Sequence, residues 1–411
     1  MILCYDGGIV MFRRFLVAAV AGLLFSGVSS TLEARTIEIR KKAQLNPTVY
    51  FAGVPGNEQL SGVLKNFLAV CGWFDLASQS EGADYTITAQ INGDRLVIRL
   101  MHGKTNVAGW SFPAKADPRE LAKSAVDAVI EKAFSQLKVR GFCRSKIAFT
   151  AESAPGIRNV FICDIDGGNL RQITQYRSLN VEPSWSPDAR SIYFSKYNPS
   201  GMSIVETTVA TPRRSRVISS SRGINTGAAV SPDGTRLAVI LSPDHQVDLY
   251  CLGLKQRERR RLTRGIAVEA SPCWSPDGRS IAFVSDRRGN PRVFTCDLSG
   301  NNLKLIPSIG NDAVTPAWST DDKIAYATRI GGNYTIAVYN MKTGENRRVV
   351  KLDGNWESPG WAADNRQVVC KRTVGNSSAL YVIDTQTGKQ RILLRTKSKL
   401  FDPAWSPCVS K

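Results

Sequence analysis

From Lys146 onward, the chain repeats one pattern of hydrophobic and polar positions. An aromatic residue is followed by a turn of the Ser-Pro-Asp type and then by a short run of apolar residues. The copies read EPSWSPDARSIYFS, GAAVSPDGTRLAVI, SPCWSPDGRSIAFVS, TPAWSTDDKIAYAT, SPGWAADNRQVVCK and DPAWSP. Their first large apolar positions, which recur every 43–45 residues, are Trp185, Val230, Trp274, Trp318, Trp361 and Trp405. Several short strands in a repeat of about 44 residues are typical of a β-propeller blade.

The third full copy predicts the strands of one blade, with the tryptophan packed between neighbouring blades. Its four strands are expected at Pro272–Ser275, Ser280–Ser285, Arg292–Leu298 and Asn302–Ile306. In the turn between the first two, a proline fixes φ and a glycine allows a positive φ. The aspartate of each such turn is expected to accept backbone hydrogen bonds and to have no catalytic role. These aspartates are Asp188, Asp233, Asp277, Asp321 and Asp364.

The repeat is predicted to close on itself. It opens at Lys146–Thr150 with a second strand that lacks its first strand, and it ends at Asp402–Trp405 with a first strand that lacks the rest. Pairing these two segments completes a sixth blade and removes two exposed strand edges. The sequence therefore predicts a six-bladed β-propeller over residues 146–411, closed by its C-terminal strand.

Residues 35–140 are predicted to form a small α/β domain, joined to the propeller by a linker at 141–145. A helix is expected at Glu58–Cys71, and a second one begins after Asp117 as N-cap. Its apolar stripe is Leu121, Ala125, Val129, Ala133 and Leu137. Strand patterns are expected at Thr48–Val54, Tyr85–Ile91, Leu96–Leu100 and Val107–Phe112. The fold class is thus a two-domain α+β and all-β chain.

The N-terminus has the layout of a secretory signal peptide, predicted at residues 1–34. Two arginines after Met11, a candidate true start, precede an apolar run of about a dozen residues and then small residues. The run is short for a permanent span, which needs about 20 residues, although an N-terminal anchor stays open. We expect a periplasmic chain, peripheral to the envelope, with no transmembrane helix after cleavage. Export would place its cysteines in an oxidising compartment.

The composition argues against most catalytic and metal chemistry. The chain has only two histidines, His102 and His245, and none of its nine cysteines forms a CxxC pair. We expect no catalytic residue, no metal and no cofactor. Cys163, Cys251 and Cys296 are expected at one register of the third strand, as buried apolar side chains. Cys408 is expected near the start of the array, and the sequence leaves open which cysteines pair.

Positive charge is the strongest compositional signal, because lysine and arginine outnumber aspartate and glutamate by 54 to 35. Two clusters, Arg213–Arg216 and Lys255–Arg264, are expected near the outermost strands of their blades. Such charges discourage edge-to-edge aggregation, or they bind an anionic partner. An exported chain would meet the envelope surface rather than nucleic acid.

First strands line the channel of a propeller, so the residues before each Trp-Ser-Pro unit are expected at one channel mouth. They are small or polar and are the candidate protein-binding site: Glu182, Gly227, Ser271, Thr315, Ser358 and Asp402.

Together, the repeated units, the DPAWSP ending and the junction RGFCRSKIAFT at residues 140–150 resemble the TolB family of the periplasmic Tol-Pal system. The resemblance covers nearly the whole mature chain. It implies a non-enzymatic scaffold whose propeller binds the lipoprotein Pal, with Asn225, Thr226, Gly227, Ala270 and Ser271 in the matching region. It also implies a tail that engages TolA, here Arg35, Thr36, Ile37, Glu38 and Ile39. Ala122-Lys123 departs from the family, which has a histidine after the alanine, and this tail is basic where we expect an acidic one.

The resemblance implies a role in outer-membrane integrity and in its invagination during division. Two other classes remain as alternatives. A propeller-based hydrolase would need a GxSxG motif, which is absent from the sequence, and a lyase would need His245 in the channel, whereas His245 follows a loop motif. An exported polyanion-binding module would use the arginine clusters.

Overall fold

The structure is a computed structural model that describes residues 46–199, 201–255, 258–350 and 352–408. The expectations for the signal peptide, its cleavage and the tail Arg35–Ile39 therefore lie outside the described residues. The described residues from Pro47 onward form one compact unit.

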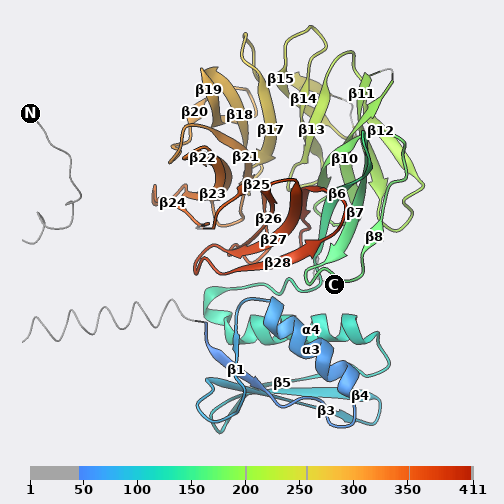
Figure 1. Ribbon diagram of the computed structural model, residues 1–411, viewed down its shortest axis with the longest axis vertical. Coiled ribbons are helices and arrows are strands. Elements are labelled where there is room, and N and C mark those ends of the chain that lie inside the picture. Colours follow the sequence, from blue (N-terminus) through green and yellow to red (C-terminus); the bar gives the residue numbers. More distant parts are fainter. Residues whose placement is uncertain (1–45, 200, 256–257, 351, 409–411) are drawn as a thin grey trace, which may run out of the picture. The chain divides into compact units, whose positions relative to one another are not determined.

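The first part of this unit is a small α/β domain built on a five-stranded sheet with the order β2-β1-β3-β4-β5. Strand β1 pairs in parallel with β2 and β3, whereas β3, β4 and β5 form an antiparallel meander. Figure 1 shows the sheet below the two helices. The elements are β1 (Thr48–Phe51), α3 (Glu58–Val70), β2 (Asp75–Leu76), β3 (Tyr85–Asn92), β4 (Arg95–His102), β5 (Thr105–Pro113), α4 (Pro118–Ala133) and the 3₁₀ turn η1 (Ser135–Leu137).

Both helices begin where the sequence predicts, and α3 ends one residue before the expected Cys71, whereas α4 ends at Ala133, before the expected Leu137. Asp117 caps α4 by accepting from the backbone N–H groups of Arg119 and Glu120, as expected. The expected stripe is wrong at Leu137, whose side chain is 68% exposed. Because Phe134 leaves the helical conformation at φ −113°, the later residues turn away from the core. In the described part of the chain, every helix is too short or too polar to cross a membrane.

The second part of the unit is a ring of six four-stranded antiparallel sheets, the blades of a propeller. Blade 1 has the order β29-β6-β7-β8, and its pairing of Leu400 with Ala151 and of Trp405 with Ile147 confirms the predicted closure. The other five blades follow chain order, and most of their strands are labelled in Figure 1.

Blade 1 contains β6 (Lys146–Ala154), β7 (Ile157–Asp164), β8 (Arg171–Gln172) and β29 (Leu400–Trp405). Blade 2 contains β9 (Asn180–Trp185), β10 (Ser191–Asn198), β11 (Gly201–Thr208) and β12 (Ser215–Ser219). Blade 3 contains β13 (Asn225–Val230), β14 (Arg236–Leu241), β15 (Asp248–Gly253) and β16 (Arg259–Arg261). Blades 4 to 6 contain β17 (Glu269–Trp274), β18 (Ser280–Arg288), β19 (Asn290–Asp297) and β20 (Lys304–Leu305); β21 (Ala313–Trp318), β22 (Lys323–Ile330), β23 (Asn333–Asn340) and β24 (Asn346–Arg348); β25 (Asn355–Trp361), β26 (Gln367–Val374), β27 (Ser377–Asp384) and β28 (Gln390–Arg395).

The recurring tryptophans join neighbouring blades, as predicted. The indole N–H of Trp274 donates to the carbonyl of Ala229 in the preceding blade at 2.8 Å. Trp185 and Trp361 make the equivalent bonds at 3.0 Å, to Ala404 and Ala317. Blades 2, 4 and 6 are each bonded in this way to the blade before them.

The expected register of the three cysteines is wrong for Cys251. Cys163 pairs with Ile147, and Cys296 pairs with Ile281, at the start of their second strands. Leu252, not Cys251, holds this register in blade 3, since it pairs with Leu237. A shift of one residue turns a strand side chain to the other face, and Cys251 is accordingly only half-buried. All eight described cysteines are free thiols.

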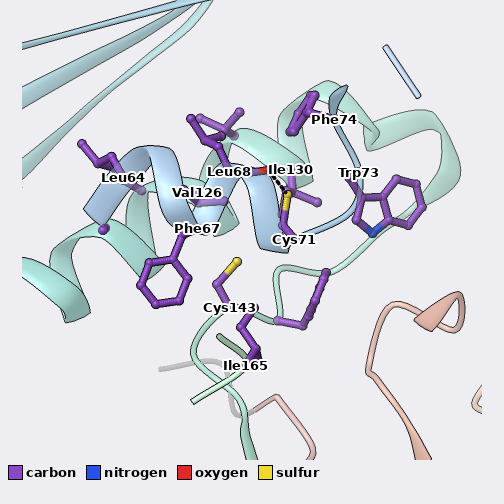
Figure 2. Close-up of a cluster of buried hydrophobic side chains, with 14 of the residues drawn as sticks. Leu64, Phe67, Leu68, Cys71, Trp73, Phe74, Val126, Ile130, Cys143 and Ile165 are labelled. Atoms are coloured by element: carbon purple, nitrogen blue, oxygen red, sulfur yellow. Dashed lines mark hydrogen bonds between the residues drawn. The ribbon is translucent and has the colours of Figure 1, made fainter. Parts of the chain in front are cut away.

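The α/β domain and blades 1 and 6 share one hydrophobic core. Figure 2 shows Phe67 of α3 and Cys71, which caps this helix, close to Cys143 of the connecting segment and to Ile165, which follows β7. The segment 141–145, predicted as a linker, contributes the fully buried side chains of Phe142 and Cys143. Burial raises the pKa of the Cys71 thiol to about 12. We call this contact region the junction.

Candidate functional site

Six equivalent residues of the innermost strands surround the central channel, and we call them the channel ring. In each blade the pairing of the first and second strands shifts at these residues, so that two residues oppose one in a β-bulge. All six adopt a left-handed conformation, with φ between 46° and 65°. The ring consists of Glu182, Gly227, Ser271, Thr315, Ser358 and Asp402.

The left-handed conformation has a cost in five of the six blades, where the ring residue carries a side chain. An L residue in this region is strained by about 1–2 kcal/mol. Only Gly227 avoids the strain. A Cβ at this position would lie 2.9 Å from Cδ of Pro272, so that the neighbouring blade also leaves no space for one. Strain repeated at equivalent positions around one opening marks a candidate functional site.

The channel ring lines a cavity of about 470 Å³. Below the ring, its wall is largely apolar and is built from the prolines and tryptophans of the repeated units, among them Pro272, Trp274 and Trp361. A mostly apolar cavity with a few converging polar groups has the composition of a binding site.

Two residues of blade 5 that line the cavity contain unpaired polar atoms, the hydroxyl of Thr315 and the indole N–H of Trp318. Within the described residues, neither atom has a hydrogen-bond partner, whereas the equivalent Trp361 indole is bonded. Both atoms are themselves buried, and because buried polar groups in proteins are nearly always paired, they set blade 5 apart from its neighbours.

The two acidic members of the ring lie next to each other, in blades 1 and 2. The Glu182 carboxylate crosses to blade 3, where it accepts from the Thr226 hydroxyl and from the Gly227 backbone N–H at 3.0 Å. The Glu182 backbone N–H points to the Asp402 carboxylate at 3.4 Å. Burial, together with the negative charge of Glu182, raises the pKa of Asp402. One side of the ring is therefore anionic, and the rest carries glycine and hydroxyls.

The other predicted site residues lie beside the ring and do not line its cavity. Asn225 is fully buried, and its amide oxygen accepts from the Ser219 hydroxyl at 2.7 Å, which fastens the connection between β12 and β13. Thr226 orients Glu182, as described above. Ala270 is half-buried in β17.

Neither His102 nor His245 lines the channel cavity. His245 lies in the turn between β14 and β15 at φ 68°, as expected of a loop residue, and His102 ends β4. The turn aspartates accept hydrogen bonds from their own turns, as Asp277 does from Ser275 and Arg279. Among the described residues, no three His, Cys, Asp or Glu side chains come together to hold a metal ion.

Sequence reasoning missed a buried ionic cluster at the junction. The Nζ atom of Lys123 in α4 lies 2.7 Å from the carboxylate of Asp164 at the end of β7, and both side chains are fully buried. Lys146 and Arg119 also pair with Asp164, and Arg119 reaches Asp166 at 2.6 Å. The signal was present, since Lys123 lies among the apolar positions of α4 and is where the chain departs from the family pattern.

Comparisons with known proteins agree with this architecture. A family model described as the TolB beta propeller domain (PD40) matches residues 135–409. A TolB homolog of Chlorobium luteolum is 31% identical over 264 residues, which cover 64% of this chain and 60% of that protein. The chain thus matches less than two thirds of that relative's length. A Tol-Pal system protein TolB of Helicobacter pylori is 23% identical over 369 residues, covering 82% of this chain and 87% of the relative.

A solved structure supports the fold of both parts. The crystal structure of TolB from Acinetobacter baumannii superposes with a TM-score of 0.79 at 22% identity, over 89% of this chain and 97% of that one. The superposition includes the small α/β domain because it extends well beyond the propeller. The family match covers more than half of the chain and ends with the closing strand. The chain belongs to the TolB β-propeller family.

Proposed function

We propose that this chain is a docking protein of the Tol-Pal system in the periplasm, which binds the lipoprotein Pal at its channel ring and has no enzymatic activity. The observation that carries the proposal is the ring itself. Six left-handed bulges bring six small or polar residues to one opening. Two relatives with the printed name TolB support the choice of system, and one of them is named for Tol-Pal.

The geometry suits recognition of a protein segment. A bulge re-aims the side chain that it carries, so each ring residue faces the cavity instead of continuing the ladder. A segment that enters the channel would bury apolar groups against the prolines and tryptophans. It would also form hydrogen bonds with polar ring residues that line the cavity, such as Glu182, Ser271 and Ser358. Such pairing adds specificity, because a wrong partner leaves buried polar groups unpaired.

The wider role is also part of the proposal. Binding of Pal at the ring would attach the outer membrane to the cell wall and support its inward constriction during division. The tail Arg35–Ile39 would engage TolA, which would couple two binding events on one chain.

Thr315 offers the sharpest test of the ring. It already occupies the left-handed region at φ 48°, so an arginine there adds bulk and charge without a new backbone strain. Thr343 is an exposed threonine in the outer turn between β23 and β24 of the same blade. The two substitutions, Thr315→Arg and Thr343→Arg, therefore make the same chemical change in one blade at different distances from the channel.

Binding of purified, detergent-solubilised Pal would be measured by titration calorimetry for the full chain and both variants. We expect Thr315→Arg to weaken binding at least tenfold, which is about 1.4 kcal/mol, and Thr343→Arg to leave it unchanged. Equal affinity of all three proteins, or no binding of Pal to the unmodified chain, would contradict the proposal. Unchanged thermal midpoints of the two variants would exclude misfolding as the cause of any loss.

A further inference from the structure

The outer edge of blades 3 and 4 contains a hollow lined by arginines. Strand β16, the outermost strand of blade 3, supplies three of them, and the turn between β19 and β20 of blade 4 forms the opposite side. The hollow has a volume of about 630 Å³. No described Asp or Glu lines it. The five guanidinium groups belong to Arg259, Arg260, Arg261, Arg264 and Arg287, and we call this site the arginine hollow.

Two of the five arginines form ion pairs with buried carboxylates. Arg261 pairs with the buried Asp248, and Arg287 pairs with the buried Glu269 at 2.6 Å. These pairs hold the two guanidinium groups in place.

The other three, Arg259, Arg260 and Arg264, are exposed and have no ion pair among the described residues. Arg259 lies with its guanidinium 5.6 Å from the centre of the Tyr250 ring, so it is held in position without being neutralised. Arg260 also borders a second hollow of about 500 Å³, together with Lys255, Arg236 and the acidic Glu258. An excess of positive over negative charge in one region attracts an anionic partner.

The loop that leaves this strand adds an apolar element. Ile266, two residues after Arg264, is 97% exposed, and Val268 is 49% exposed. Leu303, which lines the hollow, is 43% exposed. Solvent-facing aliphatic side chains beside unpaired arginines fit a surface that offers phosphates above hydrocarbon, which is the surface of an anionic bilayer. No aromatic side chain among the described residues lines the hollow for base stacking, which argues against single-stranded nucleic acid.

We propose that the arginine hollow binds the phosphate groups of an anionic lipid bilayer and that Ile266 inserts among the lipid headgroups. The surface lies on outermost strands, whereas the channel ring lies on innermost ones. A protein partner in the channel and a membrane at the rim would therefore contact different parts of the propeller. The proposal does not depend on Pal being the channel partner.

The test measures sedimentation of the full chain with lipid vesicles. One set of vesicles contains phosphatidylcholine alone, and the other also contains phosphatidylglycerol. The double variant Arg260→Glu/Arg264→Glu changes the hollow. The matched control, Arg213→Glu/Arg214→Glu, makes the same change of charge at two exposed arginines in the turn before β12 of blade 2. A third variant, Ile266→Ser, removes the apolar contact and leaves the charge unchanged.

We expect the unmodified chain to bind only the vesicles that contain phosphatidylglycerol. The hollow variant should lose roughly tenfold or more of this binding, because each basic residue near an anionic surface contributes separately. The blade 2 control should lose little, and Ile266→Ser should bind more weakly. Soluble tripolyphosphate provides the second arm, since its binding should depend on the arginines and not on Ile266.

Three results would overturn the proposal. The first is an equal loss in both double variants, which would show attraction by net charge alone. The second is binding of tripolyphosphate without binding of vesicles, which would assign the hollow to a soluble polyanion. The third is absence of vesicle binding by the unmodified chain. Thermal midpoints would show that each variant is folded.

Discussion

Two carboxylates, Asp164 at the junction and Asp402 in the channel ring, have pKa values shifted in opposite directions. Burial alone would raise the pKa of Asp164, but hydrogen bonds from Lys123 and Lys146 outweigh it and lower that pKa. The pKa of Asp402 is raised by burial and by the neighbouring charge of Glu182. The negative charge of Asp164 is therefore stabilised by lysines of the same chain, whereas the negative charge of Asp402 is disfavoured by its surroundings.

This difference distinguishes the junction, a structural contact, from the channel ring, a surface available for binding. At the junction, the buried carboxylates of Asp127 and Asp164 both pair with cations, and the two parts of the unit share a core. In the ring, strained backbone, an uncompensated acid and unpaired polar groups all remain. Such features persist where a partner supplies the missing contacts.

The largest effect is expected from breaking the junction. Asp164→Ala leaves the buried Lys123 with the half-exposed Glu120, at 2.7 Å, as its remaining described partner, and loss of one partner of a buried ion pair costs about 3–5 kcal/mol. The free energy of unfolding would be measured by denaturant titration at neutral pH, where Asp164 is ionised. Asp75→Ala is the matched control, because its pair with Lys389 at 2.8 Å is exposed on both sides and such pairs contribute about 0–1 kcal/mol. Equal losses in the two variants would refute the distinction.

A smaller loss is expected from adding one methyl group to the ring. Gly227→Ala combines a φ of 65° with a Cβ only 2.9 Å from Cδ of Pro272. We expect it to destabilise the fold by about 1–3 kcal/mol in the same denaturant titration. Ser271→Gly is the reciprocal change, which relieves strain at φ 46° and should be neutral or slightly stabilising. A loss in Ser271→Gly as large as in Gly227→Ala would show that the bulges are not strained.

The smallest effect concerns the charge of Asp402. A carboxyl whose pKa is raised by folding stabilises the fold in its protonated form, and this stability is lost as pH rises through the raised pKa. Asp402→Asn removes the charge and should therefore increase stability at neutral pH. The gain should vanish below the ordinary aspartate pKa of about 3.9, where the unmodified side chain is also neutral. Thermal midpoints across this pH range test it, and a gain that persists in acid would contradict the assignment.

The fold could be predicted largely because its pattern is local and repeated. The period of the Trp-Ser-Pro units gave the number of blades, and the mismatch between its two ends gave the closure, which the pairing of β29 with β6 confirms. Short elements were harder. The outer strand of blade 4 is only Lys304–Leu305, shorter than predicted, and β2 was not predicted, because two-residue strands carry no periodic signal.

The sequence predicts which residues form the candidate site, but not their backbone conformation. Counting back from the five tryptophans and from Val230 gave the positions of the six ring residues. Their left-handed bulges depend on pairing with the second strand, which the sequence of one strand does not show. The junction was invisible for a similar reason. Lys123 and Asp164 are 41 residues apart in the sequence, and only the packing of α4 on blade 1 brings them together.

Photo-crosslinking in intact cells tests the central claim, that the channel ring is the docking site, most directly. A photoreactive amino acid would replace Ser358, a ring residue, and in a second strain Thr343 in the outer turn of blade 5. The account predicts that Ser358 cross-links to Pal and that Thr343 does not. Cross-linking of Pal from Thr343 alone, or from neither position while Pal still co-purifies with the chain, would contradict it.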